Sequence, residues 1–299
     1  MRSVSEPRPQ EAVVDILAAM LRDASRSIGR REALSVIGLG ALAVVRSAAA
    51  AEPALHFGGL DHVEFTVSDP AKSIAFYARI FGNAVLKNNK TTRRYLQLGP
   101  CYIAMERGQE IHVDHFCSGI EGFDISGLHG YLERLGIAYR DYPSGRDLYV
   151  TDPDGTRLQL GGYRSWNSLL NGTASPESLP AAGEPIFRPA GFDHILVNVT
   201  DVATSVAFYE KIFGPVVRRN NNRTWFQAGK TQVGLLETPA GQRAGVNHYC
   251  VSAAPFDYAD ATRKLEQAGA SLVEPEVRGA PEFRDSDGYL IQVMGPRGR

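Results

Sequence analysis

The chain contains one sequence pattern twice, and this duplication restricts its fold more than any other feature. Residues 60–89 align without a gap with residues 192–221, and both segments contain Asp-His, then Ala-Phe-Tyr, then Ile-Phe-Gly. The correspondence continues in two further pairs of segments, 113–117 with 246–250 and 152–159 with 285–292. A repeat at a fixed spacing indicates repeated structural units. We therefore predict two copies of one domain, over residues 54–163 and 189–297.

Each copy combines strand and helix signals, which predicts an α+β fold. In the first copy, residues 62–67 alternate between apolar and polar residues, as a half-buried strand does. Asp69-Pro70 is a typical helix start, and Gly82 a typical helix end. Further strand candidates follow, and a second strand–helix unit begins near Val113. Asp152–Gly155 ends in Asp-Gly, which predicts a turn between the last two strands.

The segments outside the two copies are of different kinds. Arg30-Arg31 precedes an apolar run over residues 33–45 and small residues at 48–51. This order is that of a secretory signal, and the paired arginines resemble a twin-arginine signal. We therefore expect residues 1–51 to direct export to the bacterial periplasm or cell exterior. An uncleaved anchor or a cytoplasmic tail is the alternative. Residues 164–188 are rich in Ser, Gly, Pro and Ala, which indicates a linker.

Composition narrows the classes of partner. The 32 basic and 33 acidic residues nearly cancel, without a basic block that would indicate nucleic-acid binding. The apolar run near the N-terminus is shorter than the roughly 20 residues of a membrane span. Three cysteines without a CxxC pair indicate neither a disulfide framework nor a thiolate zinc site. We expect a small-molecule substrate, no nucleic acid and no stable membrane span after signal cleavage, and we leave open whether the chain forms a homodimer.

Taken together, these motifs resemble the vicinal oxygen chelate superfamily. The resemblance rests on the early Asp-His, the S-x-A-F-Y-x-x-I-F-G helix, the histidine of the second unit and the D-P-D-G turn. This superfamily includes glyoxalases, bleomycin-resistance proteins, epimerases and extradiol dioxygenases. The resemblance implies tandem domains, each made of two βαβββ units that form an open, curved sheet around a metal.

The same resemblance implies a metal-ligand set in each copy, on the first strand of each unit and on the last strand. Those positions hold His62, His115 and Gln159 in the first copy and His194, His248 and Gln292 in the second. Imidazole suits Fe, Zn, Ni or Cu. A single histidine on a strand is more often a core residue, but four at repeated positions favour a metal site. We expect a divalent metal, with Fe(II) favoured and Zn, Mn, Ni or Co as alternatives.

The sequence departs from the family pattern at two ligand positions. The third ligand is usually Glu, and Gln in both copies removes a negative charge from the site. That change favours an anionic chelating substrate; alternatively, it indicates a metal site that has lost its function. A fourth ligand, present in glyoxalases and epimerases, is missing, because Ala104 and Gly234 occupy its position by register.

Two candidate catalytic residues lie near the last strands. Tyr149 precedes Asp152 and Gln159 in a pattern that resembles the extradiol dioxygenase signature, and Glu282 occupies the equivalent position in the second copy. Both residues have an alternative interpretation as ordinary strand ends beside a turn. Cys117 and Cys250 either line the cup or pack in the core. Asp61 and Asp193 precede ligand histidines on a strand, which predicts that they face the opposite side and are structural.

Three functions therefore remain open. The first is an extradiol-type ring-cleaving dioxygenase, supported by the three-ligand set and Tyr149. The second is a glyoxalase- or epimerase-like lyase or isomerase that uses metal-assisted proton transfer, supported by Glu282. The third is a non-catalytic small-molecule binding protein of the bleomycin-resistance type, supported by the two glutamines.

Overall fold

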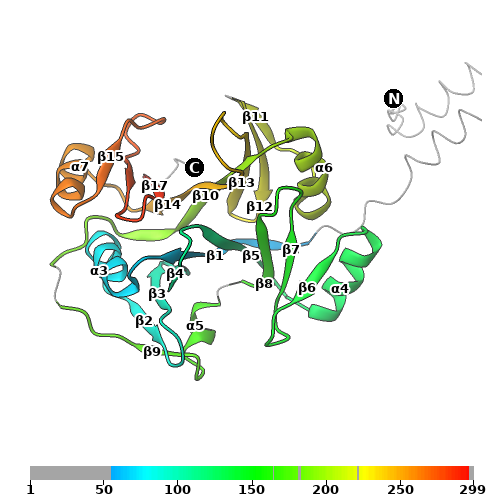
Figure 1. Cartoon of the computed structure of the whole chain (residues 1–299), viewed down its shortest axis with the longest axis horizontal. Helices are drawn as coiled ribbons and strands as arrows, with labels where there is room; N and C mark the ends of the chain where they lie inside the picture. The colour runs from blue at the N-terminus through cyan, green and yellow to red at the C-terminus, as the bar shows by residue number, and fades with distance from the viewer. Residues whose placement is uncertain (1–54, 164, 181–182, 221, 296–299) are drawn as a thin grey trace, which may run out of the picture. The chain divides into compact units, whose positions relative to one another are not determined.

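The computed structural model describes residues 55–163, 165–180, 183–220 and 222–295 (Figure 1). The expected signal segment, residues 1–51, lies outside the described residues. Within the described part of the chain, no helix combines the length and apolar character needed to cross a membrane.

The first copy forms one sheet from two βαβββ units. Its elements are β1 (Phe57–Val67), α3 (Pro70–Phe81), β2 (Val85–Asn88), β3 (Arg94–Leu98), β4 (Cys101–Arg107), β5 (Val113–Ile120), α4 (Ile125–Arg134), β6 (Tyr139–Asp141), β7 (Leu148–Thr151) and β8 (Arg157–Gly162). The strand order is β6-β7-β8-β5-β1-β4-β3-β2, and a later strand, β9, extends the β2 edge.

The second copy repeats this arrangement. Its elements are β10 (Pro189–Val199), α6 (Val202–Phe213), β11 (Arg218–Asn220), β12 (Arg223–Ala228), β13 (Thr231–Glu237), β14 (Gly245–Ala253), α7 (Tyr258–Gln267), β15 (Ser271–Val273), β16 (Glu282–Arg284) and β17 (Leu290–Met294). The strand order is β11-β12-β13-β10-β14-β17-β16-β15. The predicted α+β fold of tandem domains, each with two βαβββ units, is confirmed.

The topology brings the expected ligand strands side by side. In the first domain β1 pairs with β5, and β5 pairs with β8. In the second domain β10 pairs with β14, and β14 pairs with β17. Because side chains alternate between the two faces of a strand, His62 and Glu64 share one face of β1. The opposite face carries Val63 and Phe65, which are fully buried.

Local sequence explains where the first helix of each domain begins and ends. The Asp69 side chain accepts hydrogen bonds from the backbone amides of Ala71 and Lys72, and Pro70 opens the helix. Gly82 ends it with φ 106°, in the region that glycine adopts without strain. Asp201 caps α6 by accepting a hydrogen bond from the backbone amide of Thr204. These helix starts, ends and caps agree with the sequence prediction.

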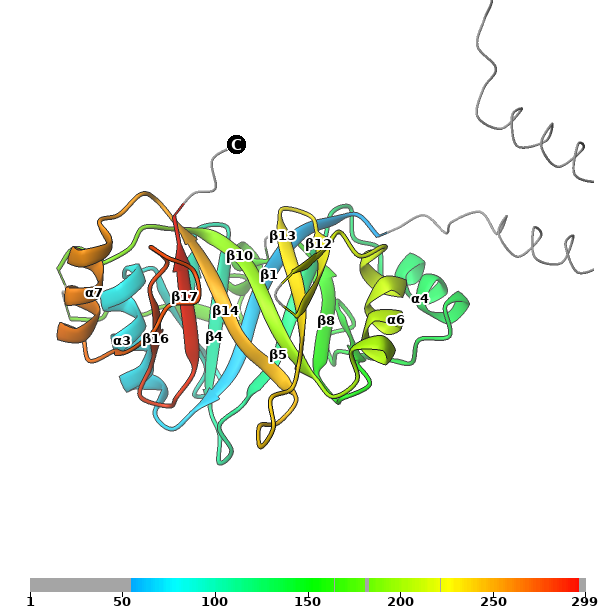
Figure 2. The ribbon, with the colours of Figure 1, turned by 90° about the horizontal axis from the view of Figure 1, so that it is seen from above.

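The D-x-D-G turns join the two domains, a role that the sequence did not indicate. Tyr77 of α3 donates a hydrogen bond to Asp285 Oδ2 at 2.7 Å, and Tyr209 of α6 donates one to Asp152 Oδ2 at 3.0 Å. In Figure 2, α3 of the first domain lies beside α7 of the second, and α6 of the second domain lies beside α4 of the first. Tyrosine and aspartate therefore form the same contact on both sides of the interface.

The segment between the domains is more than a connection. It contains the short helix α5 (Trp166–Leu169) and the strand β9 (Ala174–Pro176), which pairs with β2. The Ser165 backbone amide donates to Asp61 Oδ2 at 2.9 Å, and the Trp166 ring lies 5.8 Å from that of Tyr102. The linker therefore forms one wall of the first domain's cavity.

Candidate metal centres

The first cup is the cavity around His62 on β1, His115 on β5 and Gln159 on β8. All three side chains are buried. The Nε2 atom of His62 lies 3.2 Å from Nε2 of His115 and 3.1 Å from Oε1 of Gln159. The structure therefore brings the three predicted ligands of the first copy together.

The second cup is the equivalent cavity around His194 on β10, His248 on β14 and Gln292 on β17. The two histidine Nε2 atoms lie 3.1 Å apart. Gln292 Oε1 is buried and has no hydrogen-bond partner. A buried polar oxygen without a partner lowers the stability of the fold. Such an oxygen is available to bind an ion.

The protonation pattern of the histidines agrees with metal binding. In the first cup, His62 Nδ1 lies 2.8 Å from Asp61 Oδ1 and His115 Nδ1 lies 2.7 Å from Asp114 Oδ1. An ionised carboxylate only accepts hydrogen bonds, so each Nδ1 carries the proton and each Nε2 presents a lone pair. Two lone pairs cannot hydrogen-bond to each other. The two Nε2 atoms instead have the separation, about 3.0–3.4 Å, of neighbouring ligands on one divalent metal.

β-Bulges determine where these carboxylates lie. They explain why Asp61 and Asp193 do not face the opposite side of the strand, as we had expected. The strand register shifts by one residue immediately before His62 and before His194. A bulge redirects a side chain from regular alternation, so the Asp61 and Asp193 side chains reach the neighbouring imidazoles instead of facing away. The predicted direction of the Asp61 and Asp193 side chains was therefore wrong. The same shift occurs at Asp114 and Asn247, before His115 and His248.

Carboxylates also lie beside the two glutamines. Gln292 Nε2 donates to Glu282 Oε1 at 2.7 Å, and Asp147 lies near enough to Gln159 for the amide to lower the Asp147 pKa. The amide nitrogen of Gln292 is therefore occupied, and in the first cup Gln159 Oε1 itself lies 3.1 Å from His62 Nε2. Burial, more than any other cause, raises the pKa of Asp147 and Glu282, while the glutamine hydrogen bonds oppose that shift.

Burial keeps one histidine of each cup neutral, His115 in the first and His248 in the second. It lowers the pKa of His115 to about 3 and the pKa of His248 well below its ordinary value. Neutral imidazole is the form that binds metal. Burial also raises the pKa of the Cys117 thiol and keeps its sulfur protonated, which is not the form that binds metal. Cys117 lies on the wall of the first cup without offering a thiolate.

Aromatic rings border the donors of the first cup. The Tyr149 ring meets His115 edge-on at 5.2 Å, and Tyr149 is the cross-strand neighbour of Gln159. The Tyr102 ring stacks on His62 at 4.6 Å. Burial raises the pKa of Tyr149, so its hydroxyl stays protonated. The structure therefore places Tyr149 beside the ligand set, as the sequence predicted.

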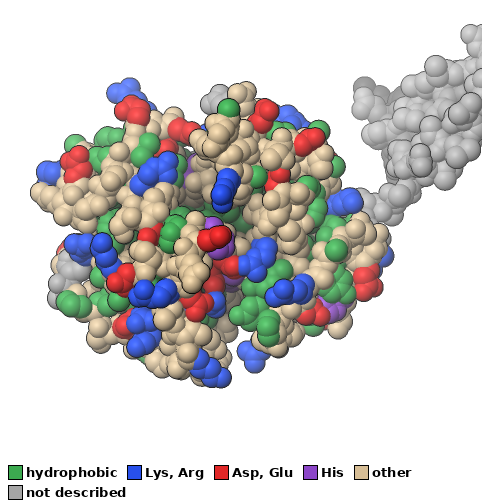
Figure 3. All heavy atoms as spheres, in the orientation of Figure 1, with side chains coloured by type: hydrophobic (Ala, Val, Ile, Leu, Met, Phe, Trp, Pro, Cys, Tyr) green, Lys and Arg blue, Asp and Glu red, His purple; other side chains and the backbone are tan. Residues whose placement is uncertain are grey.

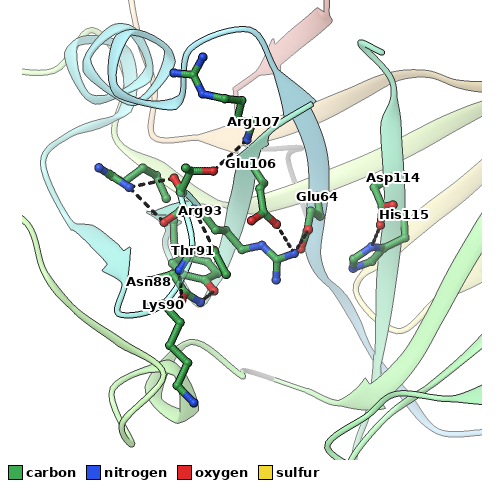
Figure 4. A network of polar contacts seen from close by, with 12 residues as sticks. Glu64, Asn88, Lys90, Thr91, Arg93, Glu106, Arg107, Asp114 and His115 are labelled. Carbon is green, nitrogen blue, oxygen red and sulfur yellow. Dashed lines mark hydrogen bonds and ion pairs between the residues drawn. The ribbon is translucent and has the colours of Figure 1, made fainter. Parts of the chain in front are cut away.

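The first cup also contains an ion-pair network that we did not predict. Arg93 lies between two carboxylates, at 2.5 Å from Glu64 Oε1 and 2.7 Å from Glu106 Oε2 (Figure 4). Glu64 is the cross-strand neighbour of His115. Alternation along β1 puts Glu64 on the same face as His62, so the sequence contained the signal for a charged residue in the cup.

The second cup is larger and differently lined. The cavity volumes are about 210 Å³ around the first ligand set and about 470 Å³ around the second. Leu196 occupies the position of Glu64, and Arg218 lies over the Trp225 ring at 4.9 Å. Histidine side chains, flanked by acidic and basic side chains, are visible in the hollowed centre of the face shown in Figure 3. The two cups therefore share donors but differ in their walls.

The expected lack of a fourth ligand agrees with the strand register. Ala104 pairs with Glu64 on β1, and Gly234 pairs with Leu196 on β10. A side chain at position 234 would begin 2.7 Å from the Trp225 ring. Neither position supplies a donor atom.

Comparisons with known proteins place the chain in a superfamily. The Glyoxalase/Bleomycin resistance protein/Dioxygenase superfamily matches residues 59–120 and 191–293, more than half of the chain. The lactoylglutathione lyase of Schizosaccharomyces pombe is 22% identical, over 79% of this chain and 95% of the relative. The metallothiol transferase FosB of Staphylococcus haemolyticus is 28% identical, over 34% of this chain and 81% of the relative.

Solved structures share the fold. The Mn(II)-bound glyoxalase from Novosphingobium aromaticivorans superposes with a TM-score of 0.61 at 14% identity, over 81% of this chain and 83% of the other. The 2,3-dioxygenase LapB from Pseudomonas sp. KL28 gives a TM-score of 0.63 at 13% identity, over 82% of this chain and 94% of the other. The chain is a member of the glyoxalase, bleomycin resistance protein and dioxygenase superfamily.

Proposed function

We propose that the chain is a metal-dependent enzyme that binds a small, chelating, anionic substrate in the first cup. Extradiol-type ring cleavage is the first candidate reaction. The observation that carries it is the position of Tyr149, edge-on to His115 and beside Gln159 across the β7–β8 pair. Three donors, two histidines and one glutamine, leave positions on the metal for the substrate and a second molecule.

The protein groups have separate tasks in this proposal. A divalent metal would supply Lewis acidity and, as Fe(II), electron transfer to oxygen. His62, His115 and Gln159 would hold it. The protonated Tyr149 hydroxyl is available to donate a hydrogen bond to a substrate oxygen. Because the three donors are neutral, the metal keeps its full charge, which favours a catecholate, an enolate or an α-hydroxycarbonyl anion.

Metal-assisted proton transfer, as in glyoxalases and epimerases, is the second candidate. The observation that favours it is Glu64, a buried carboxylate on the wall of the first cup. The lactoylglutathione lyase relative is consistent with this class. Glu282 supports it less than the sequence suggested, because its Oε1 atom already accepts hydrogen bonds from Gln292 and from the backbone of Glu276.

Reconstitution separates these reactions. The purified protein is loaded with Fe(II) without air and mixed with a panel of catechols, while oxygen uptake and the absorbance of ring-cleaved product are followed. A matched sample receives Zn, Ni or Co and is tested without oxygen on 2-oxoaldehyde–thiol adducts. Oxygen uptake only with Fe(II) supports dioxygenation, and turnover only in the second sample supports proton transfer. Ligand binding without turnover in either sample would leave the non-catalytic binding protein.

We also propose that the protein is exported. The support is the sequence alone, in which Arg30-Arg31 precedes an apolar run and small residues. Expression of the full chain, followed by separation of periplasm from cytoplasm, tests it. Loss of periplasmic protein after substitution of both arginines by lysine is the expected result. Periplasmic protein that persists would point to another export route.

A further inference from the structure

The two cups differ in charge at one of the residues that contact the donors. In the first cup Asp61 and Asp114 hold His62 and His115, and Asp147 lies beside Gln159. In the second cup Asp193 holds His194 and Glu282 holds Gln292, but Asn247 holds His248, with Oδ1 at 2.8 Å from Nδ1. One carboxylate of the first cup is therefore an amide in the second.

The positions of Asp114 and Asn247 match in their place on the strand and in their contact with the histidine. Each residue is the bulged residue immediately before a histidine, on β5 and on β14. Each accepts a hydrogen bond from Nδ1, at 2.7 and 2.8 Å. Asn247 Nδ2 donates to Asn198 Oδ1 at 3.2 Å, so its own oxygen is the atom that faces His248. The geometry is conserved between the cups while the charge differs.

The charge affects the histidine as a ligand. A carboxylate on the Nδ1 proton increases the electron density at Nε2 and stabilises the positive charge of a bound metal, and an amide does so less. Loss of such a partner typically weakens metal binding by about 10–100-fold.

We propose that Asp114 and Asn247 make the metal affinities of the two cups unequal, with the first cup the tighter site by about tenfold or more. This inference rests on the proposed metal binding. Asp114 and Asn247 act as positioning residues, since they touch the ligand histidine and not the metal. At low metal supply the first cup fills first and the second remains empty.

Other charges near the donors act in the same direction or offset one another. Asp114 also pairs with Arg157, which reduces its effect on His115 without removing the carboxylate. Glu64 adds a negative charge beside His115, where the second cup has Leu196, although Arg93 pairs with it and offsets part of that charge. In the second cup, Arg223 adds a positive charge that acts against a cation at His248, although Glu276 pairs with it.

The test titrates each cup alone. His194→Ala leaves the first cup intact and His62→Ala leaves the second. Each full-length protein is stripped of metal and titrated with Co(II), whose visible absorption reports coordination, in the presence of a competing chelator. The matched exchange is Asp114→Asn in the His194→Ala protein and Asn247→Asp in the His62→Ala protein. Thermal unfolding of the metal-free proteins checks that each variant folds.

The proposal predicts a lower Kd for Co(II) in the first cup than in the second. Asp114→Asn should raise the Kd of the first cup about tenfold, and Asn247→Asp should lower the Kd of the second cup about tenfold. Equal affinities of the unexchanged cups, or a Kd of the second cup unchanged by Asn247→Asp, would overturn it while leaving metal binding in place. Absence of Co(II) binding to both cups would overturn the proposed function as well. If Asp114→Asn fails to fold, Asn247→Asp still decides the outcome.

Discussion

The hydrogen bond between Tyr77 and Asp285 gives a quantitative test of how the two domains are held together. Tyr77→Phe removes the donor and leaves Asp285 Oδ2 without its 2.7 Å partner. Asp285 is only 7% exposed, so water replaces the lost hydrogen bond poorly. Hydrogen bonds to charged groups contribute about 1.5–3 kcal/mol. We therefore expect the free energy of unfolding near neutral pH to fall by about 2 kcal/mol.

The pH dependence of this loss has a definite sign. Burial raises the pKa of Asp285, and the Tyr77 hydroxyl opposes that shift. Without the hydroxyl the folded-state pKa rises further above the unfolded value. A carboxyl with a raised folded-state pKa destabilises the protein as pH rises through that pKa, because the unfolded chain ionises more easily. The stability difference between Tyr77→Phe and the unaltered protein is therefore smallest near about pH 4 and largest near about pH 7.

Urea unfolding with a metal chelator present measures the loss at both pH values. Tyr209→Phe is the matched variant, since Tyr209 makes the same contact with Asp152. Tyr258→Phe is the control, because that side chain is 38% exposed. A loss below about 0.5 kcal/mol in both interface variants, or a larger loss at the lower pH, would refute the reasoning.

Three further substitutions test the cups. Glu282→Gln removes the charge that holds the Gln292 amide and is expected to weaken Co(II) binding by the second cup about tenfold, with the first cup unchanged; an unchanged second cup would contradict this. Tyr149→Phe is expected to reduce turnover of the substrate found by the reconstitution screen by about 10²-fold at unchanged metal content, whereas full activity would exclude Tyr149 from the reaction. Trp166→Ala removes a buried ring that packs on Tyr102 and should lower the free energy of unfolding by about 3 kcal/mol. A loss within error would show that the linker does not support the fold.

The repeat made most of the fold predictable. Two aligned segments, each with a capped helix between strand patterns, indicated the element types, and the resemblance supplied the two βαβββ units of each domain and their open, curved sheet. The interface between the domains was not predictable, because Tyr77 and Asp285 lie far apart in the sequence and their local signals indicate only a helix and a turn. The role of residues 165–180 was missed for a similar reason, since a single strand that adds to an existing sheet has too little periodicity to be recognised.

The candidate site was predictable in its donors but not in the residues that hold them. Strict alternation placed His62 and His115 correctly and placed Asp61 wrongly, because a bulge is not visible in a single sequence. The position of Glu64 in the cup could have been predicted from the same alternation. The position of Arg93 could not, because Arg93 lies in the loop before β3, and only its contacts with Glu64 and Glu106 place it in the cup.

The most direct test of the account is the metal content of the full-length protein after purification without a tag or chelator, beside Gln159→Ala and Gln292→Ala. Two centres with three donors each predict about two equivalents of one divalent metal after loading, and the loss of one equivalent in each variant. Protein that takes up no Fe(II), Mn, Zn, Ni or Co, or variants that both keep two equivalents, would contradict the assignment of these cups as metal centres.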